Sequence, residues 1–311
     1  MVVFAQTHSE RVACRNMMEL GLALTDSDAA LALGVSGRRR SFYFGGVRFD
    51  VRVRGLQWDV PPAVQSYITA CSDALPVAGR IACALEAGPG PTLEGDADVA
   101  CEWHGDRARV RTRGLHAMLR RCDRGDYAAR ALVPSAHEGI RALTSALSAT
   151  VVEREGGIRL HAVPLQLGEK VVLLMGPSGA GKSTSADQCA GARVLSYDHA
   201  ALVRCRSRWF AWGVPGGAPA HSPVSSSRAL AVAGILRVRK ASCSPARIVP
   251  LHLVHATLAV RENAKSGTGA SGEARFLAAC AEISRALPVA ELWTVLGAPL
   301  RDVIEEWMNN A

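Results

Sequence analysis

The sequence is short of aromatic residues, of lysine and of paired cysteine motifs, and each shortage excludes a class of protein. Aromatic residues form 5% of its 311 residues, too few to indicate a surface that stacks single-stranded nucleic acid. Nine cysteines occur without a C-x-x-C pair, which argues against a disulfide framework or a zinc ribbon and suits reduced thiols. No apolar run of about 18 residues could span a membrane, and the first residues lack the pattern of an export signal. We therefore expect a cytoplasmic protein without a membrane partner.

Lysine is rare although the chain is basic, with a formal net charge of +8. Of 36 basic residues only four are lysine: Lys170, Lys182, Lys240 and Lys265. In a chain that otherwise uses arginine, Lys182 indicates a position that requires a compact ammonium group. The charge fits an acidic partner, and with so few aromatic residues a nucleotide or an acidic peptide is favoured over nucleic acid. Homo-oligomer formation stays open.

The first half of the chain is predicted to be a strand-rich α+β domain over residues 1–133. Short apolar and polar runs alternate there, and Gly-rich turns interrupt them, which predicts hairpins at 41–53 and 99–111. We expect helices near 13–24 and 62–75. A role in binding the acceptor of a reaction is the hypothesis for this domain.

The second half, residues 134–311, is predicted to be an α/β domain. Helical spacing of apolar residues over 136–152 leads into it. The continuous apolar run 171–175 predicts a strand buried on both faces, and a predicted helix at 182–190 and a strand at 193–197 complete a βαβ-type order. Further strands are predicted at 230–238 and 290–296, and further helices at 274–287 and 300–308.

A glycine-rich loop follows the apolar run directly and opens the next predicted helix. It matches G-x-x-x-x-G-K-[ST], the loop that binds nucleoside triphosphates. Its glycines let successive backbone N–H groups point at phosphate oxygens, Lys182 would reach the β- and γ-phosphates, and Ser183 can offer a hydroxyl to Mg²⁺. We therefore predict a site for ATP with Mg²⁺, formed by Gly176, Pro177, Ser178, Gly179, Ala180, Gly181, Lys182, Ser183 and Thr184.

A carboxylate close to this loop is the second part of the predicted site. Asp198 ends the predicted strand 193–197, sixteen positions after Lys182. Because the carboxyl ends of parallel strands meet at one edge of a sheet, we expect Asp198 beside the loop, as a metal ligand with Ser183 or as the group that activates the nucleophile. His161 lies on a predicted strand before the loop, where, taken alone, a structural role is the better interpretation.

Three stretches resemble the catalytic domain of HPr kinase/phosphorylase, and resemble still more the HPr-kinase-like proteins found beside peptide-modification genes. They are Leu160-His161-Ala162, the run from Val171 to Thr184, and Leu195-Ser196-Tyr197-Asp198. With a weaker likeness to the end of the chain, the resemblance covers about residues 135–311. It implies a fold akin to phosphoenolpyruvate carboxykinase.

The resemblance also implies an activity: transfer of the γ-phosphoryl group of ATP to a serine hydroxyl of a peptide or small protein. In the family the aspartate matching Asp198 serves as general base, and the histidine matching His161 lies by the phosphates. With Lys182 these are the predicted catalytic residues. The family usually carries two adjacent aspartates, whereas the first position here is Tyr197, and its glutamate-isoleucine-arginine-glycine stretch is missing. These departures favour a kinase with another acceptor over phosphorolysis and over HPr itself.

Two other hypotheses stay open at this point. The same residues would serve a kinase or carboxykinase-like enzyme that acts on a small metabolite. They would also serve a regulator that binds ATP and transfers no phosphate, for which Tyr197 in place of an aspartate is the argument.

Overall fold

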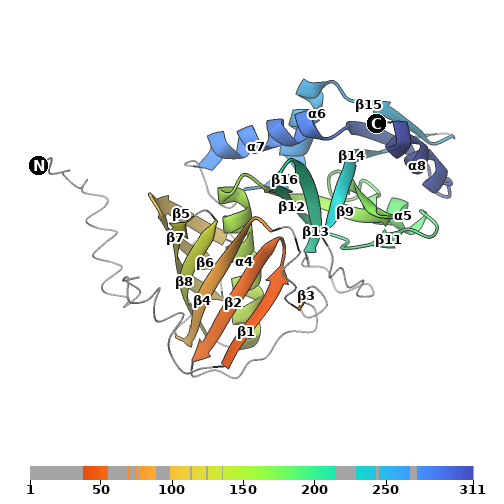
Figure 1. Ribbon diagram of the computed structural model, residues 1–311. Coiled ribbons are helices and arrows are strands. Elements are labelled where there is room, and N and C mark those ends of the chain that lie inside the picture. Colours follow the sequence, from red (N-terminus) through yellow and green to blue (C-terminus); the bar gives the residue numbers. More distant parts are fainter. Residues whose placement is uncertain are drawn as a thin grey trace, which may run out of the picture.

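The protein is a mixed α/β structure with two β-sheets, seen in a computed structural model (Figure 1). None of the helices in the part of the chain described is long and apolar enough to cross a membrane. The helix predicted at 13–24 lies outside the described residues, and so does most of the one predicted near 62–75. The structure describes residues 38–54, 69–70, 75, 77–88, 99–112, 114–123, 125–134, 136–214, 229–242, 245–266 and 272–310.

The first sheet has the strand order β3-β1-β2-β4-β8-β7-β6-β5. Strand β2 is parallel to β4, and β4 to β8, while the other neighbours are antiparallel. Thr69 and Ala70 pair with β1 as an edge strand, so the helix predicted near 62–75 is wrong at these two residues. The strands are β1 (Arg38–Phe44), β2 (Val47–Arg54), β3 (Thr69–Ala70), β4 (Gly79–Ala87), β5 (Val99–His104), β6 (Arg107–Thr112), β7 (Leu115–Asp123) and β8 (Asp126–Val133).

Both predicted hairpins are confirmed by antiparallel pairing of β1 with β2 and of β5 with β6. Their turns contain the glycines that tight turns require. Gly45 and Gly46 join β1 to β2 with φ of 54° and 80°, the left-handed conformation of a two-residue hairpin turn. Gly105, with φ of 65°, serves the turn between β5 and β6. The alternation of buried and half-buried residues along β4 and β6 then places one face of the sheet on the core.

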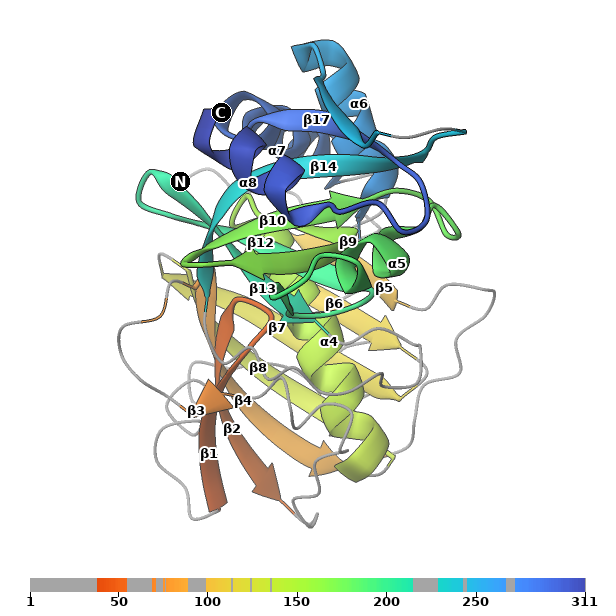
Figure 2. The ribbon, with the colours of Figure 1, turned by 90° about the vertical axis from the view of Figure 1, so that its right-hand side faces the viewer.

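The second sheet is built from strands β9 to β17. Five strands form a closed ring, in which β10 pairs with β9, β9 with β12, β12 with β13, β13 with β14, and β14 again with β10. Strand β17 pairs with β14 outside this ring, and β15 pairs with β17. Figure 2 shows the long β14 running beside β10 and β17. The strands are β9 (Ile158–Leu167), β10 (Lys170–Met175), β11 (Arg193–Val194), β12 (His199–Cys205), β13 (Arg208–Val214), β14 (Leu230–Lys240), β15 (Arg247–Pro250), β16 (Ala264–Lys265) and β17 (Val289–Thr294).

Helices cover both faces of this sheet, as the uninterrupted apolar run of β10 requires. Val171, Leu173 and Met175 pack in the same core as α6 and α7, whereas Val172 and Leu174 pack in the core that holds α5 and α8. The strands predicted at 171–175, 230–238 and 290–296 and the helices predicted at 274–287 and 300–308 are confirmed with small shifts of their ends. The helix predicted at 182–190 ends three residues early, the strand predicted at 193–197 is reduced to two residues, and α6 is additional. The helices are α5 (Lys182–Asp187), α6 (Leu253–Asn263), α7 (Glu273–Ala286) and α8 (Arg301–Asn310).

Helix α4 (Ala136–Arg154) confirms the helix predicted between the halves and packs against both sheets. One core joins its buried side chains to residues of β1, β2 and β4 to β8 and to Val203 and Trp212 of the second sheet. Trp212 stacks on Tyr43 of β1 with ring centroids 6.0 Å apart. The division into domains at residue 133/134 stays a prediction, because this core belongs to both sheets.

The βαβ order predicted after the glycine loop is wrong. Helix α5 has only six residues, and the chain then turns back into β11, which has two residues and pairs antiparallel with β9. A parallel crossover requires a dozen or more residues, most often with a helix long enough to span the sheet. Asp198 therefore does not end a parallel strand; it precedes β12, which also runs antiparallel to β9.

Candidate functional site

The glycine loop lies where three parallel strands end. Strand β10 is parallel to β14, and β14 to β17, and Met175 at the end of β10 pairs with Arg237. Strand β14 continues past this point to Lys240, which pairs with Thr294 of β17. The carboxyl ends of these strands therefore form one edge of the sheet, the usual position of a ligand site in such sheets.

The loop owes its shape to glycines at positive φ. Gly179 and Gly181 have φ of 76° and 99°, and Gly176 has φ of 154°. A Cβ atom added at Gly179 or Gly181 would meet nothing within 4 Å. The left-handed backbone rather than crowding is therefore what requires glycine at these two positions.

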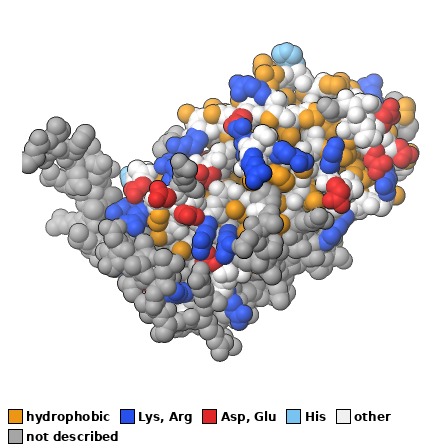
Figure 3. All heavy atoms as spheres, in the orientation of Figure 1, with side chains coloured by type: hydrophobic (Ala, Val, Ile, Leu, Met, Phe, Trp, Pro, Cys, Tyr) orange, Lys and Arg blue, Asp and Glu red, His pale blue; other side chains and the backbone are white. Residues whose placement is uncertain are grey.

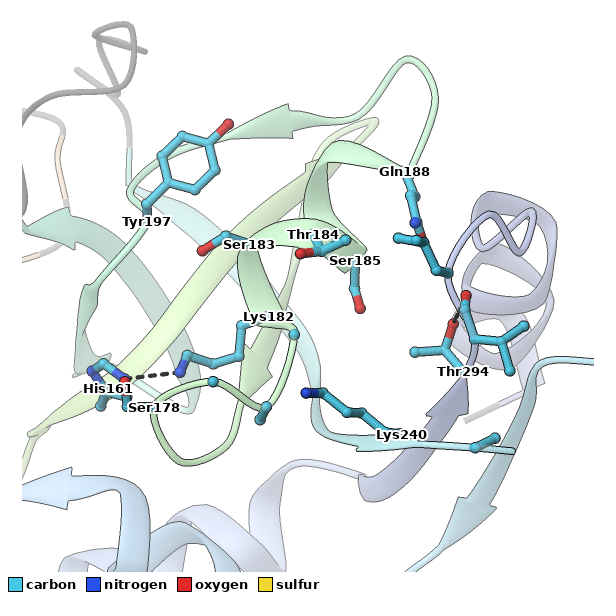
Figure 4. Close-up of a pocket in the computed structure, with 16 residues that line it drawn as sticks. His161, Ser178, Lys182, Ser183, Thr184, Ser185, Gln188, Tyr197, Lys240 and Thr294 are labelled. Carbon is cyan, nitrogen blue, oxygen red and sulfur yellow. Dashed lines mark hydrogen bonds between the residues drawn. The ribbon is translucent and has the colours of Figure 1, made fainter. Parts of the chain in front are cut away.

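An open cavity of about 590 Å³ follows this edge of the sheet (Figure 4). His161 lies at one end, the glycine loop along the middle, and Thr294 at the other end, where Leu296 is 84% exposed. Gly176, Pro177 and Asp198 are not in the lining. The cavity is lined by His161, Ser178, Gly179, Ala180, Gly181, Lys182, Ser183, Thr184, Ser185, Gln188, Tyr197, Lys240, Ala241, Thr294, Val295 and Leu296.

Lys182 is buried at the floor of the cavity, and its ammonium group has three acceptors. Its Nζ atom lies 2.8 Å from His161 Nε2, 2.9 Å from the Gly176 carbonyl oxygen and 3.1 Å from the Pro177 carbonyl oxygen. An ammonium group carries three N–H bonds, so protein atoms occupy all three. Burial lowers the pKa of Lys182, and the charge of Asp198 opposes the shift.

Two histidines hold the carboxylate of Asp198. His161 Nδ1 lies 3.0 Å from Asp198 Oδ1, and His199 Nδ1 lies 3.1 Å from Asp198 Oδ2. These contacts, more than the opposing effect of burial, hold the pKa of Asp198 well below its usual range. Because a neutral imidazole has one donor and one acceptor nitrogen, a proton on His161 Nδ1 leaves Nε2 to accept from Lys182. Lys182, His161 and Asp198 thus form one hydrogen-bonded chain.

The structure brings His161 and Asp198 together through strand pairing that the sequence analysis missed. His199 pairs with His161 between β12 and β9, and the Ala162 N–H donates to the Asp198 carbonyl oxygen at 3.1 Å. His199 is nine-tenths buried, and burial lowers its pKa. Neither of its ring nitrogens has a partner with hydrogen-bond geometry among the described residues, so the 3.1 Å approach of its Nδ1 atom to Asp198 is a close polar contact. In the sequence, the position of His199 directly after Asp198 was the only indication that this histidine belongs to the site.

Residues that could hold a metal ion lie at the His161 end of the cavity. One ligand atom each from His161, Asp198 and His199 lie within 4.8 Å of one another. Mg²⁺ prefers oxygen ligands and usually keeps waters and substrate phosphates as well. For this ion the oxygens of Asp198 and Ser183 fit better than the ring nitrogens.

Lys240 is the second lysine of the cavity, and its arginine neighbours are paired elsewhere. Arg237 lies 2.7 Å from Glu262, and Arg239 lies 2.8 Å from Glu291. Tyr197, at the position where the resembling family has an aspartate, donates from its hydroxyl to Asp187 at 2.7 Å. These contacts leave Lys182 and Lys240 as the cations of the cavity lining.

The surface around these elements carries both charges. In Figure 3, basic and acidic side chains are interspersed over the described part of the face in view.

No protein-family model matches the chain, and no curated protein matches it.

Proposed function

We infer that this chain is an ATP-dependent kinase that transfers the γ-phosphoryl group to a serine hydroxyl of a peptide or small protein. The observation that carries this proposal is the hydrogen-bonded chain from Lys182 through His161 to Asp198, at the end of a cavity lined by the glycine loop. Phosphoryl transfer uses a lysine at the phosphates and a carboxylate that receives the hydroxyl proton, and here His161 joins the two. In this proposal the second half of the chain is a catalytic unit of the HPr-kinase-like type.

The cavity suggests one orientation of ATP. The base would lie against Val295 and Leu296, with Lys240 nearby, and the phosphates would follow the loop toward His161. Lys182 would then exchange its bond to His161 for phosphate oxygens. In this orientation the γ-phosphorus faces the end of the cavity where Asp198 lies.

The transfer step can be written with these groups. The serine oxygen attacks the γ-phosphorus, the bond from that phosphorus to the β-phosphate oxygen breaks, and ADP leaves. Asp198 orients the hydroxyl and takes its proton. Because His161 and His199 keep the pKa of Asp198 low, Asp198 is a weak base, and a loose transition state in which the proton leaves late suits it.

Mg²⁺ would be held by Ser183 and Asp198 together with phosphate oxygens. When bound, the ion neutralises the charge that develops on the phosphates. The cavity exposes the Ser183 hydroxyl, and the Asp198 side chain is 24% exposed. The six described cysteines are free thiols, which supports the cytoplasmic location that we propose.

The test compares ATP binding and phosphate transfer in Lys182→Ala and Lys170→Ala. Both lysines belong to the four in the chain, and Lys170 is exposed at the start of β10. We expect Lys182→Ala to weaken ATP binding at least tenfold and to abolish transfer of label from γ-labelled ATP to serine peptides. Lys170→Ala should match the wild type.

The outcomes of this test separate the alternatives. Equal binding in both variants would refute the proposed site. Tight ATP binding without transfer to any acceptor would favour an ATP-sensing regulator, and transfer only to small molecules would favour a metabolite kinase.

A further inference from the structure

Arg159 lies on the acceptor side of the proposed site. It precedes His161 by two residues on β9, so both side chains leave the same face of the strand, about 6.6 Å apart. The half of β9 that holds them extends past the end of β10, and β16 takes the neighbouring position there, where Lys265 pairs with Arg159. The cavity lining includes His161 but neither Arg159 nor Lys265, which lie two residues farther along β9 and on β16 beside it.

The charge of Arg159 has no counterion among the described residues. Its Nη1 atom donates to the carbonyl oxygen and hydroxyl of Ser145 on α4, at 3.2 and 3.3 Å. These acceptors are neutral, and its buried Nε atom has no partner in the described part of the chain. Burial lowers the pKa of Arg159 to about 10, so the guanidinium stays charged at neutral pH.

The balance of charge around this point is positive. Asp198 is the carboxylate that acts on Arg159, and ring nitrogens of two histidines already lie 3.0 and 3.1 Å from its oxygens. Glu153, on α4, accepts a hydrogen bond from Ser266 at 2.8 Å. This neutral donor leaves the charge of Glu153 in place, so Arg159, Lys265 and Lys182 give three cations against the two carboxylates of Asp198 and Glu153, and Asp198 is the one that acts on Arg159. A partly buried cation without a counterion is costly, and an anion from outside the chain would offset that cost.

We propose that the phosphate acceptor carries a carboxylate about 7 Å from its reactive hydroxyl, and that Arg159 binds this carboxylate with Lys265 at the rim. This inference rests on the proposed kinase activity. A hydroxyl in contact with Asp198 leaves room for one row of side chains before Arg159, which is the spacing of residues i and i+2 in an extended peptide. The acceptor that fits is a serine peptide with Asp or Glu two positions from the serine. Because guanidinium binds carboxylate through two parallel hydrogen bonds, Arg159 would also fix the orientation of the peptide.

The test uses two matched peptides that differ only in Glu or Gln two positions from the serine. In steady-state transfer by the full chain, we expect the wild type to show a KM at least tenfold lower for the Glu peptide. Arg159→Gln should raise the KM for the Glu peptide to that for the Gln peptide, so that the preference for Glu is lost. Arg204→Gln is the matched control, because Arg204 is exposed on β12 and pairs with Glu282 at the surface. Lys265→Gln, at an exposed position, should raise the KM about threefold even if Arg159→Gln folds poorly.

Equilibrium binding of the same peptides without ATP separates this inference from the proposed function. If no peptide is phosphorylated but the Glu peptide still binds through Arg159, the kinase assignment fails and the anion site stands. If both peptides are phosphorylated with equal KM, or Arg159→Gln keeps the preference, the anion site is refuted and the kinase assignment stands. A small hydroxycarboxylate that is phosphorylated in an Arg159-dependent way, with neither peptide bound, would support the same site with a metabolite as its source.

Discussion

Replacement of Asp198 by Asn tests the centre of the proposed mechanism. The carboxylate has two acceptor oxygens, one for the Nδ1 atom of each histidine, whereas the amide has one acceptor oxygen and one NH₂ donor. If the amide donor faced His161, that ring would have to move its proton to Nε2, which faces the ammonium of Lys182. Two donors would then oppose each other, so we expect the amide oxygen to keep His161.

His199 must then adapt to the amide donor. Its proton would move from Nδ1 to Nε2, and Nε2 has no acceptor among the described residues. The variant loses the 3.1 Å contact between His199 Nδ1 and a carboxylate oxygen, which lacks hydrogen-bond geometry, so the cost should not exceed that of an ordinary hydrogen bond, about 0.5–1.5 kcal/mol. At roughly 2 °C per kcal/mol for a chain of this size, we expect Tm to fall by about 1–3 °C.

The effect on catalysis should be much larger than the effect on stability. Loss of a general base lowers a rate by about 10²–10⁴. The affinity for ATP measured without Mg²⁺ should stay within about threefold, because Asp198 does not line the cavity, whereas the affinity for ATP with Mg²⁺ should fall because Asp198 is a proposed ligand of the ion. The measurements are calorimetry, ATP titration and transfer of label from γ-labelled ATP. Asp187→Asn, which affects only the exposed bond to Tyr197, is the control. If the rate of phosphate transfer falls only in proportion to the loss of folded protein, the role given to Asp198 is refuted.

Three further results follow from the same geometry. A carboxyl whose pKa is lowered by folding stabilises the fold above its unfolded pKa of about 3.9, and it loses this contribution as pH falls toward the folded pKa. The stability difference between wild type and Asp198→Asn should therefore shrink below about pH 4 in acid unfolding curves. A difference that stays constant with pH would contradict this prediction. Gly181→Ala and Gly168→Ala both place a Cβ at positive φ, with nothing within 4 Å, so each should cost about 1–2 kcal/mol, while only Gly181→Ala should weaken ATP binding in titration. Leu296→Ser removes an exposed apolar side chain from the end of the cavity where we place the base of ATP, so the free energy of unfolding should change by less than about 0.5 kcal/mol. The affinity should fall for ATP but not for inorganic triphosphate. An equal loss of affinity for both ligands would place the base elsewhere.

Elements that depend on local patterns could be predicted from the sequence. The two hairpins of the first sheet combine period-2 alternation with glycine turns, and β10 combines an apolar run with the glycine loop. Strand β12 was missed because its residues from His199 to Val203 are all buried. With both faces covered, such a strand shows no alternation, and nothing local distinguishes it from a helix.

The site could be predicted in its residues but not in its arrangement. The lysine and the glycines follow from a contiguous motif, whereas the contact of Asp198 with His161 depends on antiparallel pairing between β9 and β12. That register is a tertiary property, so the sequence analysis placed Asp198 at the right site for the wrong reason. Lys240, Thr294 and Leu296 reach the cavity through the register of β14 and β17, and no motif marks them.

The saturated ammonium group of Lys182 has a consequence for the order of events. A phosphate can bind Lys182 only if one of its three bonds is given up, and of the three partners only His161 is a side chain; the other two are loop carbonyls. Release of His161 Nε2 alters the ring that also holds Asp198, so occupancy at one end of the cavity changes the group that meets the second substrate. In the kinase that we propose, the two substrates would therefore bind with coupled affinities, with the nucleotide as the first ligand. Asp198 would stay engaged until ATP is present, which would limit the transfer of phosphate to water.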